Sequence, residues 1–284
     1  MFLYWKMYRG FVCSKVVMVR VLVLVIASDS PAHYVEMQKV WIRRCTTSSA
    51  GGEGGSSKGT SQDLGYDIWF IKAKPERLWV GDIANDGPLS DTVEFDRDTM
   101  TIYVKGEETY IPGILNKTVE AIRAIGLEYD FVWRTNLSSV LDFDGLLQYC
   151  RGLNPPLGGG GPVASLKKVF YAGYTGLADV TTNKDIDSNI RFASGSGFLL
   201  SREAVQYLID NDGLLRRDLI DDVAIGALLE PRFGIVHLDR CRIKTGEENV
   251  VSVVSCGVFH FRCETYKHER TVEFMNMVDR ALER

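Results

Sequence analysis

Two charged features of the sequence suggest chemistry directly. Asp221 and Asp222 form a carboxylate pair at the start of an apolar helical run. A carboxylate in such a place can take a proton from a hydroxyl, or it can simply cap the helix. Arg134 follows an apolar run, and its planar guanidinium suits either phosphate oxygens or a surface ion pair.

Polar residues that follow apolar runs elsewhere supply the other candidates. They are Ser28 and Asp29, then Asn136 and Ser138, then the turn over residues 192–197 with Ser194, Gly195, Ser196 and Gly197, and finally His260 in the run 259–262. Each has a plain alternative: a turn toward Pro31 for Ser28 and Asp29, a tight turn for the glycines, and a core position for His260. The role of each cluster therefore depends on where the fold places it.

The elements that must position these clusters begin with a strand and a helix. Residues 21–27 are β-branched and uninterrupted, which is typical of a strand buried on both faces. Pro31 then opens a helix whose apolar side includes Val35, Met37, Val40 and Trp41.

The same alternation of strands and helices continues along the chain. We predict strands at 67–71, 129–133, 169–174, 196–200, 234–238 and 251–261, a hairpin over 92–105, and helices at 114–126, after Asn136, and at 202–211, 220–229 and 272–282. The Gly/Ser-rich residues 46–63 predict a flexible loop, and residues 158–161 a flexible connector. This order predicts an α/β fold in one domain, 1–284, with a Rossmann-like, mainly parallel sheet flanked by helices.

This fold class makes two expectations definite. The apolar runs 21–26, 68–71 and 131–133 should be neighbouring, mostly parallel strands. Ligands in such sheets bind outside the carboxyl ends of the strands, so the polar clusters that follow the strands should meet there.

Composition and missing motifs exclude several classes of protein. The chain has 284 residues, 45% hydrophobic and 25% charged, and a net charge of −4, so we expect no nucleic-acid partner. It lacks the GxGxxG, GxxxxGK[ST] and GxSxG motifs, and its six cysteines form no CxxC pair. The apolar run 16–27 is too short to span a bilayer and contains Arg20, so we expect a cytoplasmic protein without a transmembrane segment.

Five motifs occur in a characteristic order between residues 20 and 265. They are Trp41 with Arg43, the strand Asp130-Phe131-Val132-Trp133-Arg134, the stretch Ser194-Gly195-Ser196-Gly197-Phe198, the pair Asp221-Asp222 with Val223 and Gly226, and the late Phe259-His260-Phe261-Arg262. This order resembles the β-1,3-galactosyltransferase/Fringe superfamily of GT-A glycosyltransferases, in a form like those of large DNA (chlorella-type) viruses.

The resemblance implies an inverting glycosyltransferase that moves a sugar from a UDP-sugar, with UDP-xylose one candidate, to a hydroxyl of a glycan or glycoprotein. Asp222 would be the general base. Donor binding would fall to Ser28, Asp29, Arg43, Arg134, Asn136, Ser138 and His260, and acceptor or sugar binding to Ser194, Gly195, Ser196, Gly197 and Asp221. A viral enzyme of this kind would act in the host cytoplasm.

One departure from the family's pattern concerns the metal. Where the family places metal-binding carboxylates, this sequence has the neutral Asn136 and Ser138, which suit a hard divalent cation poorly. Dependence on Mn²⁺ or Mg²⁺ is therefore open, with His260 a candidate ligand, and we expect protein cations, Arg134 first, to hold the donor diphosphate. The DxD at 142–144 comes too late and is interpreted as a helix cap or solvated face. The same departure supports a rival hypothesis, a non-catalytic carbohydrate- or nucleotide-binding module.

Overall fold

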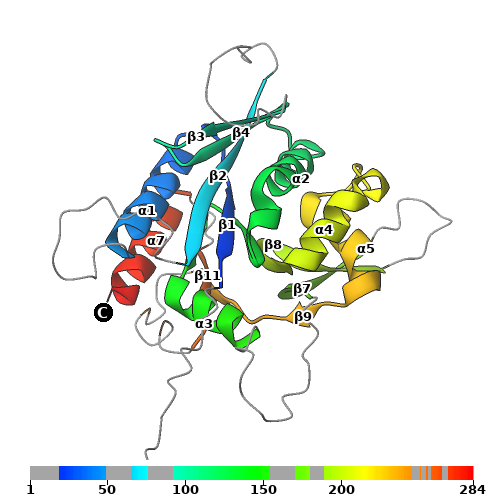
Figure 1. The fold of residues 1–284 in the computed structure, drawn as a ribbon. Helices are drawn as coiled ribbons and strands as arrows, with labels where there is room; N and C mark the ends of the chain where they lie inside the picture. The colour runs from blue at the N-terminus through cyan, green and yellow to red at the C-terminus, as the bar shows by residue number, and fades with distance from the viewer. Residues whose placement is uncertain are drawn as a thin grey trace, which may run out of the picture.

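The computed structural model describes residues 19–48, 65–75, 92–153, 170–179, 189–244, 250, 254, 257–263 and 268–283. Within these residues an eight-stranded sheet has the order β3-β4-β2-β1-β5-β8-β7-β9 (Figure 1). Its strands are β1 (Val21–Ile26), β2 (Tyr66–Lys74), β3 (Val93–Asp96), β4 (Thr101–Lys105), β5 (Phe131–Asn136), β7 (Tyr171–Asp179), β8 (Asn189–Ser201) and β9 (Val236–His237).

The centre of the sheet confirms the expected strand order. β1 pairs in parallel with β2 on one side and with β5 on the other, so the three apolar runs are neighbours. Parallel pairing also joins β2 to β4 and β7 to β9, whereas β5–β8, β8–β7 and β3–β4 are antiparallel. The described chain is therefore an α/β fold around a mainly parallel sheet.

Helices cover both faces of this sheet (Figure 1). They are α1 (His33–Ser48), α2 (Gly113–Ile125), α3 (Phe143–Leu153), α4 (Arg202–Asp210), α5 (Asp221–Phe233) and α7 (His268–Leu282), with short 3-10 turns at Gly126–Glu128 and Asp212–Leu214. One core lies under α1, α3 and α7 and the other under α2, α4 and α5. β1 contributes Val21, Val23 and Val25 to the first core and Leu22 and Leu24 to the second, which explains its uninterrupted apolar sequence.

A second, three-stranded sheet lies beside the main one. It consists of β6 (Ser139–Leu141), β10 (Cys241–Ile243) and β11 (His260–Cys263), in the order β10-β11-β6. β10 and β11 are parallel, and their register places Arg242 opposite Arg262. On β11, Phe261 and Cys263 are fully buried in the first core, so His260 and Arg262 share the other face of the strand.

Several sequence predictions need correction. Residues 46–48, assigned to the flexible loop, continue α1, because the helical pattern extends past the start of the Ser-rich stretch. β5 runs on through Asn136 and β6 precedes α3, so no helix follows Asn136 directly. Residues 192–197 form no turn but lie inside the 13-residue strand β8. The predicted loop at 49–63, the connector at 158–161 and most of the run 251–259 fall outside the described residues.

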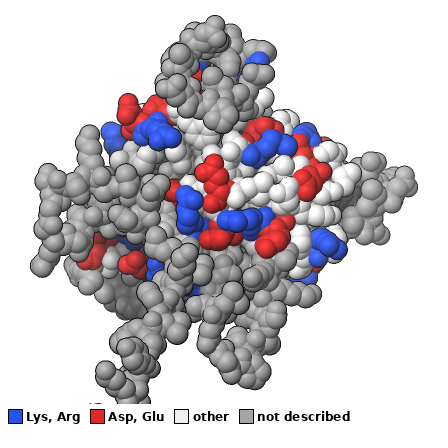
Figure 2. Space-filling view, in the orientation of Figure 1, with Lys and Arg blue, Asp and Glu red and all other residues white. Residues whose placement is uncertain are grey.

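The described surface and thiols add little chemistry outside the site. Figure 2 shows Lys and Arg interspersed with Asp and Glu over the described part of one face. Among the described cysteines, Cys150 and Cys263 are buried free thiols. Among the described helices, none combines the length and the apolar character needed to cross a bilayer.

Candidate functional site

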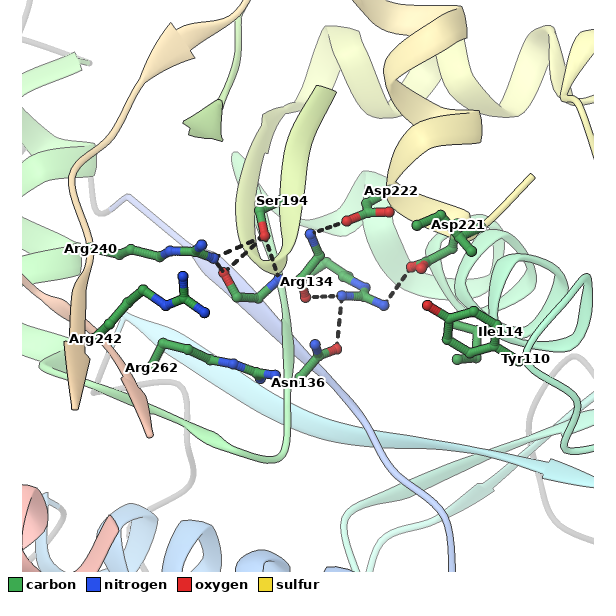
Figure 3. Close-up of a pocket in the computed structure, with 13 residues that line it drawn as sticks. Tyr110, Ile114, Arg134, Asn136, Ser194, Asp221, Asp222, Arg240, Arg242 and Arg262 are labelled. Carbon is green, nitrogen blue, oxygen red and sulfur yellow. Dashed lines mark hydrogen bonds and ion pairs between the residues drawn. The ribbon is translucent and has the colours of Figure 1, made fainter. Parts of the chain in front are cut away.

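A cavity of about 290 Å³ opens beside the carboxyl end of β5, where the fold predicts ligand binding (Figure 3). Strands β5, β8, β10 and β11, the start of α5 and the segment that enters α2 all contribute to it. Its lining consists of Tyr110, Ile114, Arg134, Asn136, Ser194, Gly195, Ser196, Ile220, Asp221, Asp222, Arg240, Arg242 and Arg262. Seven of the sequence-predicted site residues thus meet in one place.

Arg134 forms the floor of the cavity. On β5 it shares a face with Val132, the face covered by α2 and α5, and it is only 2% exposed. Its guanidinium forms a buried ion pair with Asp221 and donates to the carbonyl of Gly195 and, over 2.9 Å, to Oδ1 of Asn136. The surface ion pair weighed from the sequence is therefore a buried one, and most of the guanidinium's hydrogen-bonding capacity is used inside the protein.

Asp222 lies in the first turn of α5 at the edge of the cavity. Its Oδ2 accepts the N–H of Gly195 over 2.6 Å, and its Oδ1 accepts the N–H of Val223 over 3.0 Å. Burial, followed by the neighbouring charge of Asp221, raises the pKa of the Asp222 carboxyl above its ordinary value. A carboxylate has about four lone-pair sites, so two remain for a hydroxyl in the cavity.

The two glycines of β8 have separate structural reasons. A Cβ at position 195 would lie 2.9 Å from Nη1 of Arg134 and 3.1 Å from Oδ2 of Asp222, so only glycine lets this strand bridge the two groups. A Cβ at position 197 would lie 2.5 Å from the ring of Trp133 and 2.8 Å from the ring of His260. Gly195 therefore belongs to the cavity, whereas Gly197 allows close packing behind it.

Three arginines form the opposite wall of the cavity. Figure 3 shows Arg240, Arg242 and Arg262 reaching in from the side of β10 and β11, away from Asp221 and Asp222. Arg240 donates to the hydroxyls of Ser194, over 2.9 Å, and Ser196, and its guanidinium lies 4.1 Å from the ring centre of Tyr174. Arg262 donates to the hydroxyl of Ser138. The β10–β11 register explains why Arg242 and Arg262 stand side by side.

His260 lies behind this wall and does not line the cavity. It is 2% exposed, and its Nε2 lies 3.3 Å from the hydroxyl of Ser139. Burial, with Arg240 and Arg262 nearby, lowers the pKa of His260 to about 3, so its ring is neutral at ordinary pH.

Four other predicted donor residues also lie outside the cavity lining, namely Ser28, Asp29, Arg43 and Ser138, whose hydroxyl accepts from Arg262. Ser28 and Asp29 follow β1; the Ser28 hydroxyl accepts the N–H of Ser30 over 3.4 Å, and Asp29 pairs with Lys72 over 2.5 Å. Arg43 contacts α7 instead, with its guanidinium 2.8 Å from Asp279 and 2.6 Å from Oδ1 of Asn276. The structure thus gives Arg43 a role in packing α1 against α7.

The oxygens around this cavity do not fit a divalent cation. Asn136 and Ser138, at the positions of the expected ligands, accept hydrogen bonds from Arg134 and Arg262. Two further guanidinium groups, those of Arg240 and Arg242, line the same space, and the described residues contain no group of three or more His, Cys, Asp or Glu side chains arranged to hold a metal. The donor set therefore suits an anion better than a cation.

Arg240, Arg242 and Tyr110 were not among the sequence candidates. Arg240 and Arg242 are two residues apart, a spacing that puts both side chains on one face of an extended segment. That spacing was a usable signal, but β10 is only three residues long and has no apolar run to reveal it. Tyr110 precedes Pro112 in a connecting segment without periodicity, and only the fold brings it to the site.

The two aspartates of the DxD at 142–144 lie where α3 begins. Asp142 directly precedes α3 and its carbonyl accepts the N–H of Leu146 over 3.0 Å, while Asp144 is exposed in the first turn of that helix. Neither carboxylate lines the cavity, which agrees with interpreting residues 142–144 as the start of a helix.

Comparisons with known proteins find distant likenesses in structure only. No protein-family model and no curated protein sequence matches the chain. A glycosyltransferase involved in the glycosylation of the major capsid of PBCV-1 is similar over 91% of this chain and 100% of its own, with 8% identity and a TM-score of 0.43. The glycosyltransferase GlyE of Streptococcus pneumoniae TIGR4 is similar over 94% of this chain and 62% of its own, with 10% identity and a TM-score of 0.39. Likenesses this distant do not identify an activity.

Proposed function

We propose that the chain is a glycosyltransferase that moves a sugar from a UDP-sugar to a hydroxyl of a glycan, with inversion at the anomeric carbon. The observation that carries this proposal is the division of charge in one cavity. Three arginines line one wall, a buried carboxylate with a raised pKa stands across from them, and the cavity lies at the carboxyl end of β5. Sugar transfer from a nucleotide requires a site that stabilises an anionic leaving group and a group that accepts a proton from the acceptor hydroxyl.

The arginine wall suits the donor diphosphate. Arg240, Arg242 and Arg262 offer planar donor groups that stay charged at working pH and match phosphate oxygens. The proposal gives diphosphate binding to Arg242 and Arg262 of the small sheet and to Arg240 just before it. The sequence had suggested this role for Arg134, whose donors are directed to Asp221, Gly195 and Asn136. Binding UDP by arginines would need no divalent cation.

Asp222 suits the role of general base. Its two backbone hydrogen bonds fix the carboxylate, and its remaining lone pairs are available to an acceptor hydroxyl. The hydroxyl proton would pass to Asp222 as the acceptor oxygen bonds to the anomeric carbon. The bond from that carbon to the diphosphate breaks in the same step, and UDP leaves with the electron pair, held by the arginines. UDP-xylose remains one candidate donor.

The experiment is a calorimetric titration of UDP in EDTA, repeated with Mn²⁺, together with a UDP-release assay over a panel of UDP-sugars. We expect binding in EDTA. Arg242→Ala and Arg262→Ala should each weaken it about ten- to a hundredfold, as expected for one charge-assisted contact of roughly 1.5–3 kcal/mol. Arg216→Ala is the matched control, because Arg216 pairs with Asp218 on the surface and does not line the cavity.

Two results would change this assignment. Binding that requires Mn²⁺ and ignores both arginine variants would replace the arginine wall with a metal site. A rival function also has an observation in its favour: both oxygens of Asp222 already accept backbone N–H groups, which a purely structural aspartate would do as well. Tight UDP binding without UDP release from any sugar donor would favour that non-catalytic binding module.

A further inference from the structure

Tyr110 is an exposed aromatic side chain in a mainly polar cavity. It is 68% exposed, and it lines the cavity together with the aliphatic Ile114 and Ile220. Figure 3 shows Tyr110 and Ile114 beside Asp221, on the side opposite Arg240, Arg242 and Arg262. A large apolar surface left open to solvent at one end of a cavity is typical of a ligand contact.

The backbone on either side of Tyr110 is firmly held. Oε1 of Glu108 accepts the N–H of Ala73 over 2.5 Å, and both Glu108 oxygens accept from the buried Lys117, at 2.6 and 2.9 Å. Thr109 links the chain before Tyr110 to the chain after it. Its hydroxyl accepts the N–H of Gly113 over 3.0 Å, and its carbonyl accepts the N–H of Ile114 over 3.1 Å. The ring is therefore presented from a fixed segment, which lowers the entropy that binding must overcome.

The order of groups across the cavity matches the order of groups in the two substrates. In a UDP-sugar the nucleobase lies beyond the diphosphate, and the anomeric carbon lies on its other side. If the diphosphate contacts the arginines and the anomeric carbon lies near Asp222, the acceptor must approach from the side of Tyr110. The nucleobase would lie in the opposite direction, away from this ring.

We propose that Tyr110, with Ile114 and Ile220, forms the acceptor subsite and binds the apolar C–H face of a pyranose ring. The inference rests on the proposed function and adds the chemical class of the acceptor, a sugar ring that presents three or more C–H bonds on one face. Such a face packs on an aromatic ring through apolar contact while the hydroxyls at its edge stay solvated or reach Asp222.

The test is saturation-transfer NMR of the full-length protein with saturating UDP. The probes are methyl β-D-galactopyranoside and methyl β-D-glucopyranoside, with mannitol as an acyclic polyol that has no ring face. We expect the ring C–H protons of a pyranoside, but not mannitol, to receive saturation. Tyr110→Phe should keep this binding, and Tyr110→Ala should weaken it about tenfold with the UDP dissociation constant unchanged. Leu214→Ala is the matched control, because Leu214 is equally exposed at 68% but lies off the cavity.

Other results would overturn either the acceptor subsite or the proposed function. If the wild-type protein binds UDP but neither pyranoside, or if Tyr110→Ala binds them as well as the wild type does, the acceptor subsite is overturned and the donor site stands. A tenfold loss of UDP affinity in Tyr110→Ala would make the ring a nucleobase contact and also overturn the inference. Absence of UDP binding in the wild type would overturn the proposed function itself.

Discussion

The Asp222 carboxylate is subject to opposing influences on its pKa. Its oxygens accept backbone N–H groups from Gly195 and Val223, which favour the charged form, yet burial and Asp221 raise its pKa overall. A carboxyl with a raised pKa holds its proton more readily than an ordinary one, which improves a general base as long as the working pH stays above that pKa. The surroundings therefore fix the orientation of the group and tune its basicity through separate contacts.

Replacing this carboxylate tests its role. We expect Asp222→Asn to lower kcat by about 10²–10⁴. Because an amide has one acceptor oxygen where the carboxylate has two, one of the backbone N–H groups loses its partner, so we expect the unfolding free energy to fall by about 1–3 kcal/mol. Steady-state UDP release and urea unfolding measure the two effects. Asp218→Asn, at an exposed position three residues before α5, should keep both values.

The pH profile gives an independent reading of the same residue. The base must be ionised, so kcat/KM of the wild type should rise with pH through a limb that lies above the ordinary carboxyl value of 3.8. The free energy of unfolding should change with pH in the opposite direction. The native state keeps this proton to a higher pH than the unfolded chain does, so the stabilisation by Asp222 is largest below pH 3.8 and is lost as pH rises through the folded pKa. A transfer rate that is flat across this range, or a rate retained in Asp222→Asn, would make Asp222 a structural residue.

His260 should make the fold sensitive to acid. Its pKa is about 3 when folded and 6.5 in a model peptide, so below pH 6.5 the unfolded chain binds a proton that the native state does not. We expect this residue alone to remove up to about 1.4 kcal/mol of stability per pH unit between pH 6 and 4. Urea unfolding at several pH values should show a shallower slope for His260→Gln and an unchanged slope for His237→Gln, which replaces an exposed histidine on β9. Equal slopes in all three proteins would contradict the assignment.

At the scale of elements, the site depends on one antiparallel insertion in a parallel sheet. β8 runs against β5, which brings Gly197 opposite Thr135 and sets Gly195 beside Arg134 and Asp222. Had the strand next to β5 been parallel, its carboxyl end would have lain at this edge instead of its middle. The long β8 therefore supplies strand backbone, rather than a loop, to the wall of the cavity, and strand backbone holds its hydrogen-bonding groups in fixed register.

The contact between α1 and α7 gives a prediction for Arg43. Asp279 on α7 is 1% exposed and binds both Arg43 and the buried Arg44, over 2.8 and 3.1 Å. Asp279→Ala removes the carboxylate shared by two guanidinium groups and should cost about 3–5 kcal/mol in urea unfolding. Arg43→Ala, at a half-exposed position, should cost less than about 1 kcal/mol and leave UDP affinity unchanged. A tenfold loss of UDP affinity in Arg43→Ala would restore the donor-binding role that its motif implied.

At the scale of the molecule, the strands at the centre of the sheet were the most predictable part. β1 and the first half of β5, residues 131–133, are buried on both faces, so these stretches are continuous apolar runs that no turn or surface helix would carry. The Ser-Gly stretch of β8 was misassigned to a turn. Its residues are small because Trp133, His260 and Arg134, from distant parts of the sequence, pack closely against them. Local propensity is overridden there by tertiary packing.

The cavity was predictable on one side and not on the other. Arg134 and Asn136 end β5, and Asp221 and Asp222 begin α5, so their place at the carboxyl edge follows from the fold class. Arg242 comes to the site on the three-residue strand β10, with Arg240 just before it, and Arg242 meets Arg262 only through the register of β10 with β11. The register between two short strands leaves no pattern in the sequence of either one. The gathering of these arginines on one wall could therefore not be predicted from the sequence.

The pairing of β1 also affects how the chain is made. β1 is among the first described elements, yet its second neighbour, β5, ends about 110 residues further along the chain. At 5–20 residues per second, synthesis leaves one edge of this wholly apolar strand without its partner for about 5–20 s. During that interval β1 presents an unpaired hydrophobic edge on the ribosome. We therefore expect early chaperone binding and slow translation in cool culture to keep the recombinant chain out of inclusion bodies.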